Sequence, residues 1–360
     1  MDVDTELEAW LTLSLAPGLS DENFRRLLVA FGGPQQILGA TRKALASVVS
    51  ERAAAAVAAP LTLEQLRVVG AWLDDASNRI VTFADSFYPQ ALLQIPDAPP
   101  VLYAKGRVEL LNHTAFAVVG SRNATQHGIA HAESFARVLS DAGLTIVSGL
   151  ALGIDAAAHR GGLAGASSTV AVVGTGLDLV YPARNRELAH ELARSGCIVS
   201  EFALGTGPIA SNFPRRNRLI SGLGRGCLVV EAAVSSGSLI TARMANEQGK
   251  DVFAMPGSVN SPLAKGCHSL IKQGAKLVET ADDILEELGM PAASVLSSAP
   301  VANETANHEV LKTLGYDPCD IDTLCAKSGV STDLIAALLT QWELEGLIEA
   351  LPGGRYQRVR

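Results

Sequence analysis

The sequence lacks the features of membrane, secreted and disulfide-rich proteins. Its 360 residues contain no run of eighteen apolar residues, so no membrane span is predicted. The acidic start, MDVDTELEAW, has none of the basic and apolar segments of a signal peptide. The five cysteines are far apart and form no CxxC pair, which argues against disulfides and structural zinc. These absences predict a soluble, cytoplasmic protein with buried thiols.

Several signatures of nucleotide-using and hydrolytic enzymes are also missing. No GxxxxGK[ST] occurs, which excludes a P-loop ATPase, and no glycine-rich turn completes GxGxxG. His127 and His131 are spaced like the histidines of HExxH but lack its glutamate. Carboxylates do not cluster as two-metal catalysis requires. We therefore expect no catalytic residue, no metal and no cofactor.

The composition is that of a globular protein with more than one domain. The chain is 48% hydrophobic and 18% charged, with 33 glycines, and this length predicts two or three domains. A net charge of −8 excludes a protein that is basic over its whole surface. It does not exclude a local basic groove, because the field near a surface depends on where the charges lie.

Residues 1–79 predict a small domain of short helices. Ser20 is a candidate N-cap, together with Asn23, for the helix that carries Phe24. The stretches TRKALASVVSERAAAAVAAP and TLEQLRVVGAWLDDASN each predict a further helix. The turn APGLS resembles that of a helix-hairpin-helix or SAM-like module. Such a turn either contacts a DNA backbone or simply packs two helices, and we favour packing because the segment carries more acids than bases.

Residues 80–288 predict a Rossmann-like α/β domain. Short apolar runs such as AFAVVGS, LTIVSG, TVAVVGTG and CLVVEA alternate with helical stretches. Continuous apolar strands of this kind are typical of a mostly parallel sheet that helices cover on both faces. Right-handed crossovers then give a doubly wound architecture.

The C-terminal part predicts a linker and a winged helix. Residues 289–304 are rich in Ala, Ser and Pro and lack periodicity, as in a linker. Residues 305–360 contain three helical stretches followed by a strand, a turn and a strand. The third helix carries Asp333, Glu343 and Glu345 and no basic residue. We favour a protein contact over DNA reading, because a helix that enters the major groove normally needs positive charge.

Four glycine-rich turns follow predicted strands: GSRNATQHG, GLALGIDAAAHRGG, GTGLDLVYPARN and AVSSGSLITA. In a doubly wound sheet ligands bind outside the carboxyl ends of the strands, so these turns and Arg122 predict an anion-binding rim. Asp155 and His159 lie one helical turn apart. They form either an acid–base pair or, as we favour, a structural pair in which His159 hydrogen bonds to Asp155.

An arginine-rich stretch, NFPRRNRLISGLGRG, spans residues 212–226, and no Asp or Glu occurs from 202 to 230. We expect Pro214 to end a strand and a helix to follow it. Arginines of this helix, with Arg122, could hold phosphates bidentately, while Phe213 stacks on a base. The alternative is that the arginines pair with acids such as Glu201, Glu231 or Asp155.

Taken together, the motifs VVGSRNAT, SGLALGIDAAAHRGGL, VAVVGTGLDLVYPARN, NFPRRNRLISGL and EAAVSSGSLITARMANEQGKDVFAMPG resemble the DNA-processing protein A (DprA/Smf) family. The resemblance covers roughly residues 80–285. It implies a homodimer that binds single-stranded DNA in a pocket of its Rossmann-like domain. It further implies that the protein displaces single-strand-binding protein and loads the recombinase RecA during natural transformation. Members of this family are mediators and not enzymes.

The resemblance and the turns together give the expected DNA-binding residues. In YPARN, Ala183 stands where family members often carry lysine, which leaves the role of Arg184 open. The expected set is Gly120, Ser121, Arg122, Gly149, Gly153, Asp155, His159, Arg184, Asn185, Asn212, Phe213, Pro214, Arg215, Arg216, Asn217, Arg218, Ser236, Gly237, Ser238 and Thr241.

Two enzymatic functions are alternatives to single-stranded DNA binding. Rossmann-like relatives include nucleoside-monophosphate phosphoribohydrolases, which carry PGGxGTxxE after a strand. Here the only PGG is at 352–354, within the predicted C-terminal hairpin. A nuclease would need clustered carboxylates for its metal ions.

Overall fold

The chain divides into two units, Met1–Leu296 and Ser297–Arg360, and each is described by itself. The computed structural model describes residues 4–57, 61–291, 310–311, 313–314, 318–344, 346–351 and 354–358. Of the predicted linker over 289–304, all but the first three residues lie outside the described residues. The predicted boundary between residues 79 and 80 stays a prediction, because the contacts place both sides of it in the first unit.

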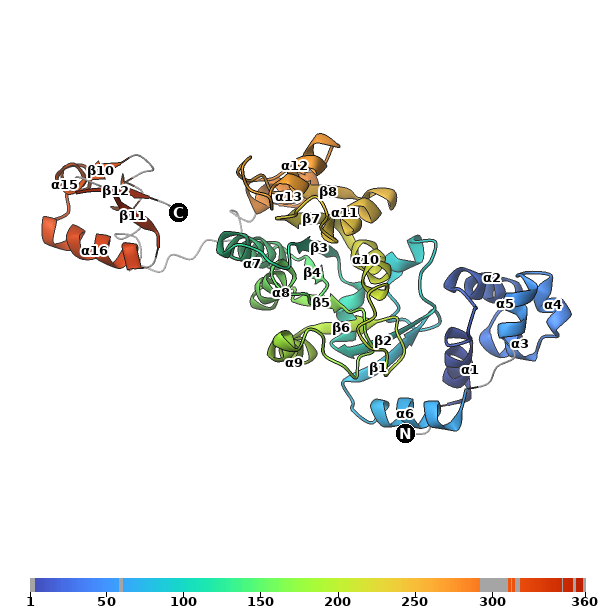
Figure 1. Ribbon diagram of the computed structural model, residues 1–360. Helices are drawn as coiled ribbons and strands as arrows, with labels where there is room; N and C mark the ends of the chain where they lie inside the picture. The colour runs from blue at the N-terminus through green and yellow to red at the C-terminus, as the bar shows by residue number, and fades with distance from the viewer. Residues whose placement is uncertain are drawn as a thin grey trace. The chain divides into compact units, whose positions relative to one another are not determined.

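A nine-stranded, mostly parallel sheet forms the centre of the first unit (Figure 1). Its order is β1-β2-β6-β5-β4-β3-β7-β8-β9, and only β1 and β2 are antiparallel to their neighbours. The sequence pattern does not predict β2, which follows two prolines. The strands are β1 (Asn78–Thr82), β2 (Val101–Gly106), β3 (Ala115–Gly120), β4 (Thr145–Ser148), β5 (Thr169–Val172), β6 (Cys197–Ser200), β7 (Gly224–Val230), β8 (Asp251–Ala254) and β9 (Lys276–Leu277).

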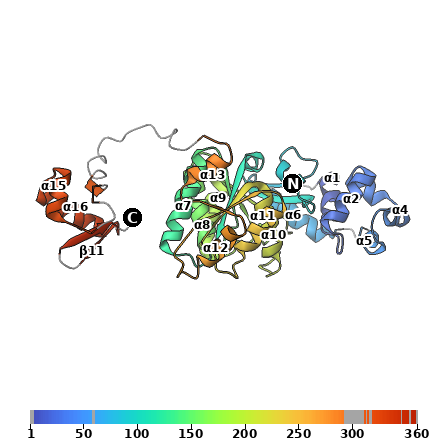
Figure 2. The same cartoon turned by 90° about the horizontal axis from the view of Figure 1, so that it is seen from above.

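Helices cover both faces of this sheet, which confirms the doubly wound architecture (Figures 1 and 2). Along β3, Phe116 and Val118 belong to one core and Ala117 and Val119 to the other, because successive side chains of a strand point to opposite faces. One face carries α7 (Gln126–Asp141), α8 (Ile154–Ala164), α9 (Arg186–Ser195) and α13 (Ala281–Glu287), and the other carries α10 (Asn212–Leu223), α11 (Ser238–Glu247) and α12 (Lys265–Lys272).

The connections reverse direction at β3. From β3 the chain adds β4, β5 and β6 on one side, and then returns to place β7 against the other side of β3. Parallel sheets open a crevice at such a point, just beyond the carboxyl ends of the two strands. Gly120 ends β3 and Val230 ends β7, so the turns that follow them border this crevice.

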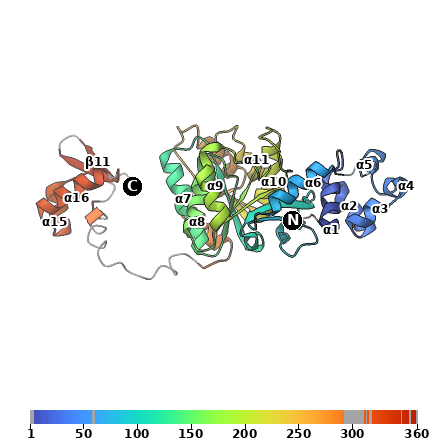
Figure 3. The ribbon, with the colours of Figure 1, turned by 90° about the horizontal axis from the view of Figure 1, so that it is seen from below.

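Within the described residues 4–57 and 61–77, six helices precede the sheet and pack at its β1–β2 edge, where Trp10 and Phe24 share a core with Val101 and Tyr103 (Figure 3). Ser20 accepts a hydrogen bond from the backbone N–H of Asn23, 3.2 Å away, which confirms the predicted cap. The helices are α1 (Thr5–Ser14), α2 (Asp21–Phe31), α3 (Pro34–Gly39), α4 (Arg42–Ala46), α5 (Glu51–Ala56) and α6 (Leu63–Leu73).

One helix prediction in this region is wrong. The stretch that begins TRKALASVV forms two helices, α4 and α5, and not one. The break falls before Ser50, whose hydroxyl accepts from the N–H of Ala53 and so starts the second helix. A serine at an N-cap offers this bond only when the chain leaves the helical conformation there.

The described part of the second unit contains the second and third predicted helices, the predicted pair of strands and a further short strand that was not predicted. They are β10 (Cys319–Asp320), α15 (Ile321–Ser328), α16 (Thr332–Leu344), β11 (Ile348–Leu351) and β12 (Arg355–Arg358), and the strand order is β10-β12-β11. Leu324, Ile335 and Trp342 are buried in its core. The first helix predicted for this domain lies mostly outside the described residues.

The cysteines behave as predicted. All five are free, and four of them are buried. Burial raises the pKa of Cys227 to about 12 and that of Cys267 to about 11, so both stay as thiols. Within the described part of the chain, no helix combines the length and the apolar character that a membrane crossing requires.

An ionic cluster joins α10 to α2 and to the end of β6. Arg218 Nη2 lies 2.6 Å from Glu201 Oε2 and 3.3 Å from Asp21 Oδ2, and its Nε lies 3.0 Å from Asp97. Arg215 contacts the same Glu201 and Asp21, at 2.8 and 2.9 Å. The side chain of Glu201 is 1% exposed. Burial raises the pKa of Glu201 to about 7, and the two arginines oppose this rise.

We predict that Arg218→Ala destabilises the first unit. The substitution leaves the buried Glu201 without its nearest partner, and breaking a buried ion pair costs about 3–5 kcal/mol. Urea unfolding followed by circular dichroism measures this loss. Arg225→Ala is the control, because Arg225 is exposed and its removal should change the free energy of unfolding by no more than about 0.5 kcal/mol. Equal, small effects of both substitutions would contradict a stabilising role for the cluster.

Candidate functional site

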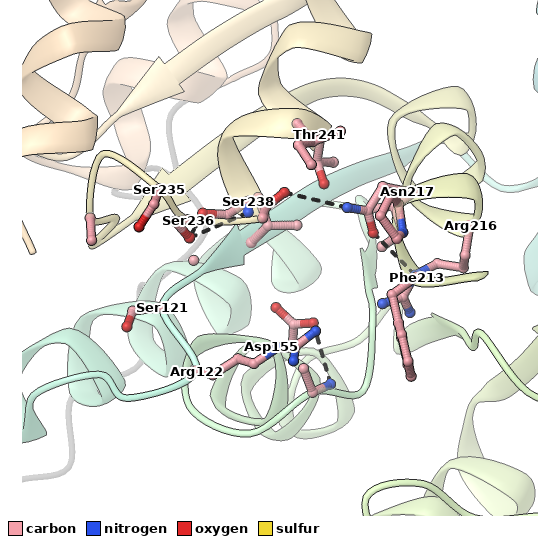
Figure 4. A pocket seen from close by; sticks show the side chains of 18 of the residues that line it. Ser121, Arg122, Asp155, Phe213, Arg216, Asn217, Ser235, Ser236, Ser238 and Thr241 are labelled. Carbon is pink, nitrogen blue, oxygen red and sulfur yellow. Dashed lines mark hydrogen bonds between the residues drawn. The ribbon is translucent and has the colours of Figure 1, made fainter. Parts of the chain in front are cut away.

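A pocket of about 680 Å³ opens at the carboxyl ends of β3 and β7 (Figure 4). It therefore lies at the reversal point of the sheet, where doubly wound proteins bind their ligands. The turn after β3, the start of α10 and the start of α11 form most of its wall. Among the polar side chains that line it are Ser121, Arg122, Asp155, Arg216, Asn217, Ser235, Ser236, Ser238 and Thr241.

The turn after β3 places Arg122 in this pocket, and Gly153 packs against the backbone of that turn. Gly153 has a φ of +75°, and a Cβ atom there would lie 2.3 Å from the carbonyl oxygen of Ser121 and 2.7 Å from that of Arg122. The N–H of Ile154 donates to the Ser121 carbonyl at 3.1 Å. Only glycine allows the two turns to pack this closely, so Gly153 positions Arg122 without lining the pocket.

Arg216 reaches the pocket from α10 and is almost completely buried, with 4% of its surface exposed. Its Nη1 donates to the carbonyl of Gly149, 2.7 Å away, and to that of Val172. Gly149 directly follows β4 and Val172 ends β5, so both carbonyls lie where the hydrogen bonds between the strands stop. Burial lowers the pKa of Arg216 to about 10, and the nearby Asp155 opposes this. The side chain is thus a buried cation at neutral pH.

Asp155 supplies the charge opposite Arg216. It is 7% exposed and accepts a hydrogen bond from the N–H of Ala151 at 3.3 Å. A Cβ atom on Gly149 would lie 2.6 Å from both Arg216 Nη2 and Asp155 Oδ2, so a side chain at this position would displace the ends of both side chains. Burial raises the pKa of Asp155, and Arg216 lowers it. The two charges stabilise one another in a site that water barely reaches.

The predicted pairing of His159 with Asp155 is wrong. His159 is fully buried, its Nδ1 lies 2.7 Å from Thr169 Oγ1, and its Nε2 accepts from the N–H of Leu150 at 3.3 Å. Burial lowers the pKa of His159 to about 3, so the ring is neutral. The helix directs this side chain at the sheet and directs Asp155 at the pocket. Because Asp155 and His159 are one helical turn apart, both lie on the inner side of α8, but their side chains are not in contact.

Aromatic rings and a guanidinium form one wall of the pocket. The Arg122 guanidinium carbon lies 5.7 Å from the centroid of the Phe213 ring, and the Tyr181 ring lies 5.6 Å from the same centroid. Tyr181 is not among the predicted residues, although it stands in the YPARN motif. Its position after a glycine-rich turn could have indicated a role in binding, because bases stack on aromatic rings.

The start of α11 forms the opposite wall (Figure 4). Ser236 Oγ lies 2.7 Å from Ser238 Oγ, and Asn217 Nδ2 donates to the Gly237 carbonyl at 3.4 Å. The first N–H groups of a helix have no partner within the helix and carry a partial positive charge. This wall therefore offers the hydroxyls of Ser236 and Ser238 and the positive end of a helix to an anion. The N–H groups of Ser238, Leu239 and Ile240 already donate to Ser236 and Gly237. Ser235 also lines it and was not predicted.

Another part of the predicted anion rim is already occupied by the protein's own carboxylate. Glu231, just after β7, accepts from the N–H of Thr125 at 2.9 Å and from its hydroxyl at 2.5 Å. Thr125 is the N-cap of α7. Glu231 therefore fills the anion position at this helix start, and α7 contributes no free site to the pocket.

The pocket lining contains twelve of the twenty predicted residues. They are Gly120, Ser121, Arg122, Asp155, Phe213, Pro214, Arg216, Asn217, Ser236, Gly237, Ser238 and Thr241. Their assignment to DNA binding stays a prediction. Pro214 does not end a strand as we expected. It lies in the first turn of α10, where a missing N–H costs nothing.

The other eight predicted residues are not part of the lining: Gly149, Gly153, His159, Arg184, Asn185, Asn212, Arg215 and Arg218. Asn185 donates to the carbonyls of Leu150 and Ala151, and Asn212 donates to that of Gly174, so both position loops of this edge. Arg184 is exposed. Arg215 and Arg218 belong to the ionic cluster, as the alternative reading of the arginine-rich stretch proposed.

Metal ligation finds no support in the described residues. No group of three or more His, Cys, Asp or Glu side chains within them could hold a metal ion.

Comparisons with known proteins agree on one family. The profile described as DNA recombination-mediator protein A matches residues 79–289, and that of the DprA winged helix domain matches 297–354. Protein Smf of Escherichia coli (strain K12) is 41% identical over 298 residues, which are 80% of this chain and 79% of that protein. DNA processing protein DprA of Streptococcus pneumoniae (strain ATCC BAA-255 / R6) is 47% identical over 203 residues, which are 56% of this chain and 72% of that one.

Two solved structures extend the agreement to the fold. The X-ray structure of DNA processing protein A from Streptococcus pneumoniae has a TM-score of 0.67 and 37% identity, and covers 80% of this chain and 99% of that chain. A structure of the Helicobacter pylori protein, solved to study its single-stranded DNA binding mode, has a TM-score of 0.53 and 30% identity, and covers 58% of this chain and 95% of that chain. The chain therefore belongs to the DNA processing protein A (DprA/Smf) family.

Proposed function

We propose that this protein binds single-stranded DNA in the pocket at the carboxyl ends of β3 and β7. The observation that carries the proposal is the cluster of Arg122, Phe213 and Tyr181 along one wall. The Phe213 ring centroid lies 5.7 Å from the Arg122 guanidinium carbon and 5.6 Å from the Tyr181 centroid. A cation beside aromatic faces suits the phosphates and unpaired bases of a strand. The single-stranded DNA binding described for the Helicobacter pylori relative supports the same ligand.

Three kinds of group would divide the contacts with the strand. Arg122 is exposed and can form a charge-assisted bond with a phosphate. Arg216 contributes positive potential, because its Nη1 is engaged by the carbonyls of Gly149 and Val172. The α11 start adds the hydroxyls of Ser236 and Ser238 and the partial positive charge of a helix N-terminus.

We further propose that the bound strand is handed to RecA, that single-strand-binding protein is displaced in the process, and that the protein acts as a homodimer during natural transformation. Membership of the recombination-mediator family supports this chain of events. In this view the protein works by binding and not by catalysis. RecA ATPase activity on strands coated with single-strand-binding protein, with and without this protein, tests the handover.

We predict that the protein binds fluorescent poly-dT more tightly than a duplex of equal length. The logarithm of the binding constant should fall with the logarithm of salt concentration, with a slope of about −0.7 per phosphate contacted. Fluorescence anisotropy at several salt concentrations gives both quantities. If no strand binds at low salt, the pocket holds a smaller ligand. Turnover of a nucleotide with magnesium would then favour the phosphoribohydrolase-like enzyme, and cleavage of the strand would favour a nuclease.

Arg122→Ala should weaken strand binding by about 1–3 kcal/mol, because one charge-assisted phosphate contact is lost. The salt slope should also become shallower by about 0.7, which separates the lost contact from a loss of folded protein. Arg225→Ala is the matched control, since Arg225 is an exposed arginine that does not line the pocket. Unchanged affinity of the Arg122 variant would refute the phosphate contact.

For the winged helix we propose a protein contact instead of DNA reading. Its third helix, α16, carries Asp333 and Glu343 and no basic residue. A chain that ends at Leu296, where the first unit ends, should bind poly-dT with nearly the affinity of the full chain. Anisotropy titration of both chains provides the comparison. A loss of binding of tenfold or more, on the order of 1.4 kcal/mol, would assign strand contacts to the winged helix.

A further inference from the structure

Four loops at the carboxyl edge of the sheet each expose a large apolar side chain. Tyr181, in the loop after β5, is 45% exposed, and Ile209, in the loop after β6, is 55% exposed. Val234 and Val259, in the loops after β7 and β8, are 71% and 68% exposed. Scattered apolar residues are ordinary on a protein surface, but at least one on each of four loops of a single edge is not a scatter. The loop after β5 also exposes Leu179 and Val180, at 42% and 38%. The side chains of Tyr181, Ile209, Val234 and Val259 are named the apolar rim.

The rim borders the mouth of the pocket. Pro208 and Ala210 line the pocket while Ile209 between them is exposed. In the same way Ala233 and Ser235 line it on either side of Val234. Each of these loops thus turns its neighbouring residues inward and its large apolar residue outward at the opening.

Tyr181 lies on the same border, whereas Val259 lies in a neighbouring loop whose Ser258 and Ser261 line a second pocket beside α7. Tyr181 itself lines the pocket, and the loop that carries Val259 also contributes Leu263 to the lining. Hydrogen bonds within the loops hold these positions. The carbonyl of Ile209 accepts from Asn212 N at 3.0 Å, and the carbonyl of Val259 accepts from Lys265 Nζ at 2.5 Å.

The apolar rim and the polar groups inside the pocket match the two kinds of surface that an unpaired strand presents, apolar base faces and charged phosphates. The pocket offers Arg122 and the α11 hydroxyls to phosphates, whereas bases expose apolar faces once they are unstacked. Resting on the proposed function, we propose that the apolar rim contacts the bases of the bound strand and holds them apart, with the sugar–phosphate backbone directed at Arg122. A duplex buries the faces of its bases by stacking them, so the rim adds affinity only for a single strand.

The test compares a normal strand with one that has no bases. The double variant Ile209→Ser/Val234→Ser is titrated with poly-dT and with an abasic phosphodiester strand of equal length. Removing apolar contact at two positions should weaken poly-dT binding by roughly fivefold to twentyfold. Abasic binding and both salt slopes should stay at their wild-type values, because no phosphate contact changes. Val29→Ser is the control, since Val29 is an 84% exposed valine on α2.

Each other outcome overturns the inference in a distinct way. If the wild-type protein binds neither strand, the proposed function fails and the rim has no strand to contact. If the wild-type protein binds poly-dT and the double variant binds it equally well, only the rim contact is refuted. Equal weakening for both strands would assign the loops to backbone contact. A loss of self-association in sedimentation velocity, with DNA affinity intact, would assign the rim to a second copy of this chain.

Discussion

The site depends on the hydrogen bonds that the buried Arg216 donates to the carbonyls of Gly149 and Val172. The last carbonyls of inner parallel strands lie where the ladder stops, and each needs a donor once the edge is covered. A guanidinium serves two of them and still carries its charge, which Asp155 balances. The helix that supplies this arginine, α10, is thereby fixed across the ends of β4 and β5. The same anchor places Phe213 and Asn217 in the pocket and leaves the neighbouring arginines on another side of the helix.

That division of α10 explains how a stretch without acids fits an acidic protein. Arg215 and Arg218 are three residues apart, so they lie on one side of the helix and meet Glu201 and Asp21 together. Asp21 opens α2, so the cluster also fixes the N-terminal helices against the sheet. The arginine-rich stretch thus has two tasks, one structural and one at the pocket. Its partners are Glu201, just before the stretch without acids, and Asp21 and Asp97, far earlier in the chain, so no acid is needed within the stretch.

The sequence was informative where one segment determines its own structure. Apolar runs followed by glycine located the parallel strands, the turns after them, and Gly120 and Arg122 at the pocket. It was least informative where a residue depends on a distant partner. Nothing near Arg218 indicates that Asp21 will meet it, and nothing near His159 indicates that Thr169 will take the hydrogen bond expected of Asp155. The antiparallel β2 escaped prediction for a similar reason, because its place between β1 and β6 is set by the sheet and not by its own pattern.

The charge balance of the pocket limits what electrostatics can contribute to strand binding. Among the residues that line the pocket, Arg122 and Arg216 face one carboxylate, Asp155. Arg216 already donates hydrogen bonds to backbone carbonyls. Such a site cannot neutralise a long row of phosphates, so counterion release gives only part of the binding free energy. In the proposed complex the remainder comes from contacts with the bases, for which the aromatic wall and the exposed apolar loops are the candidate surfaces. An acidic protein can therefore bind a polyanion without a basic surface, provided that its ligand presents unpaired bases as well as phosphates.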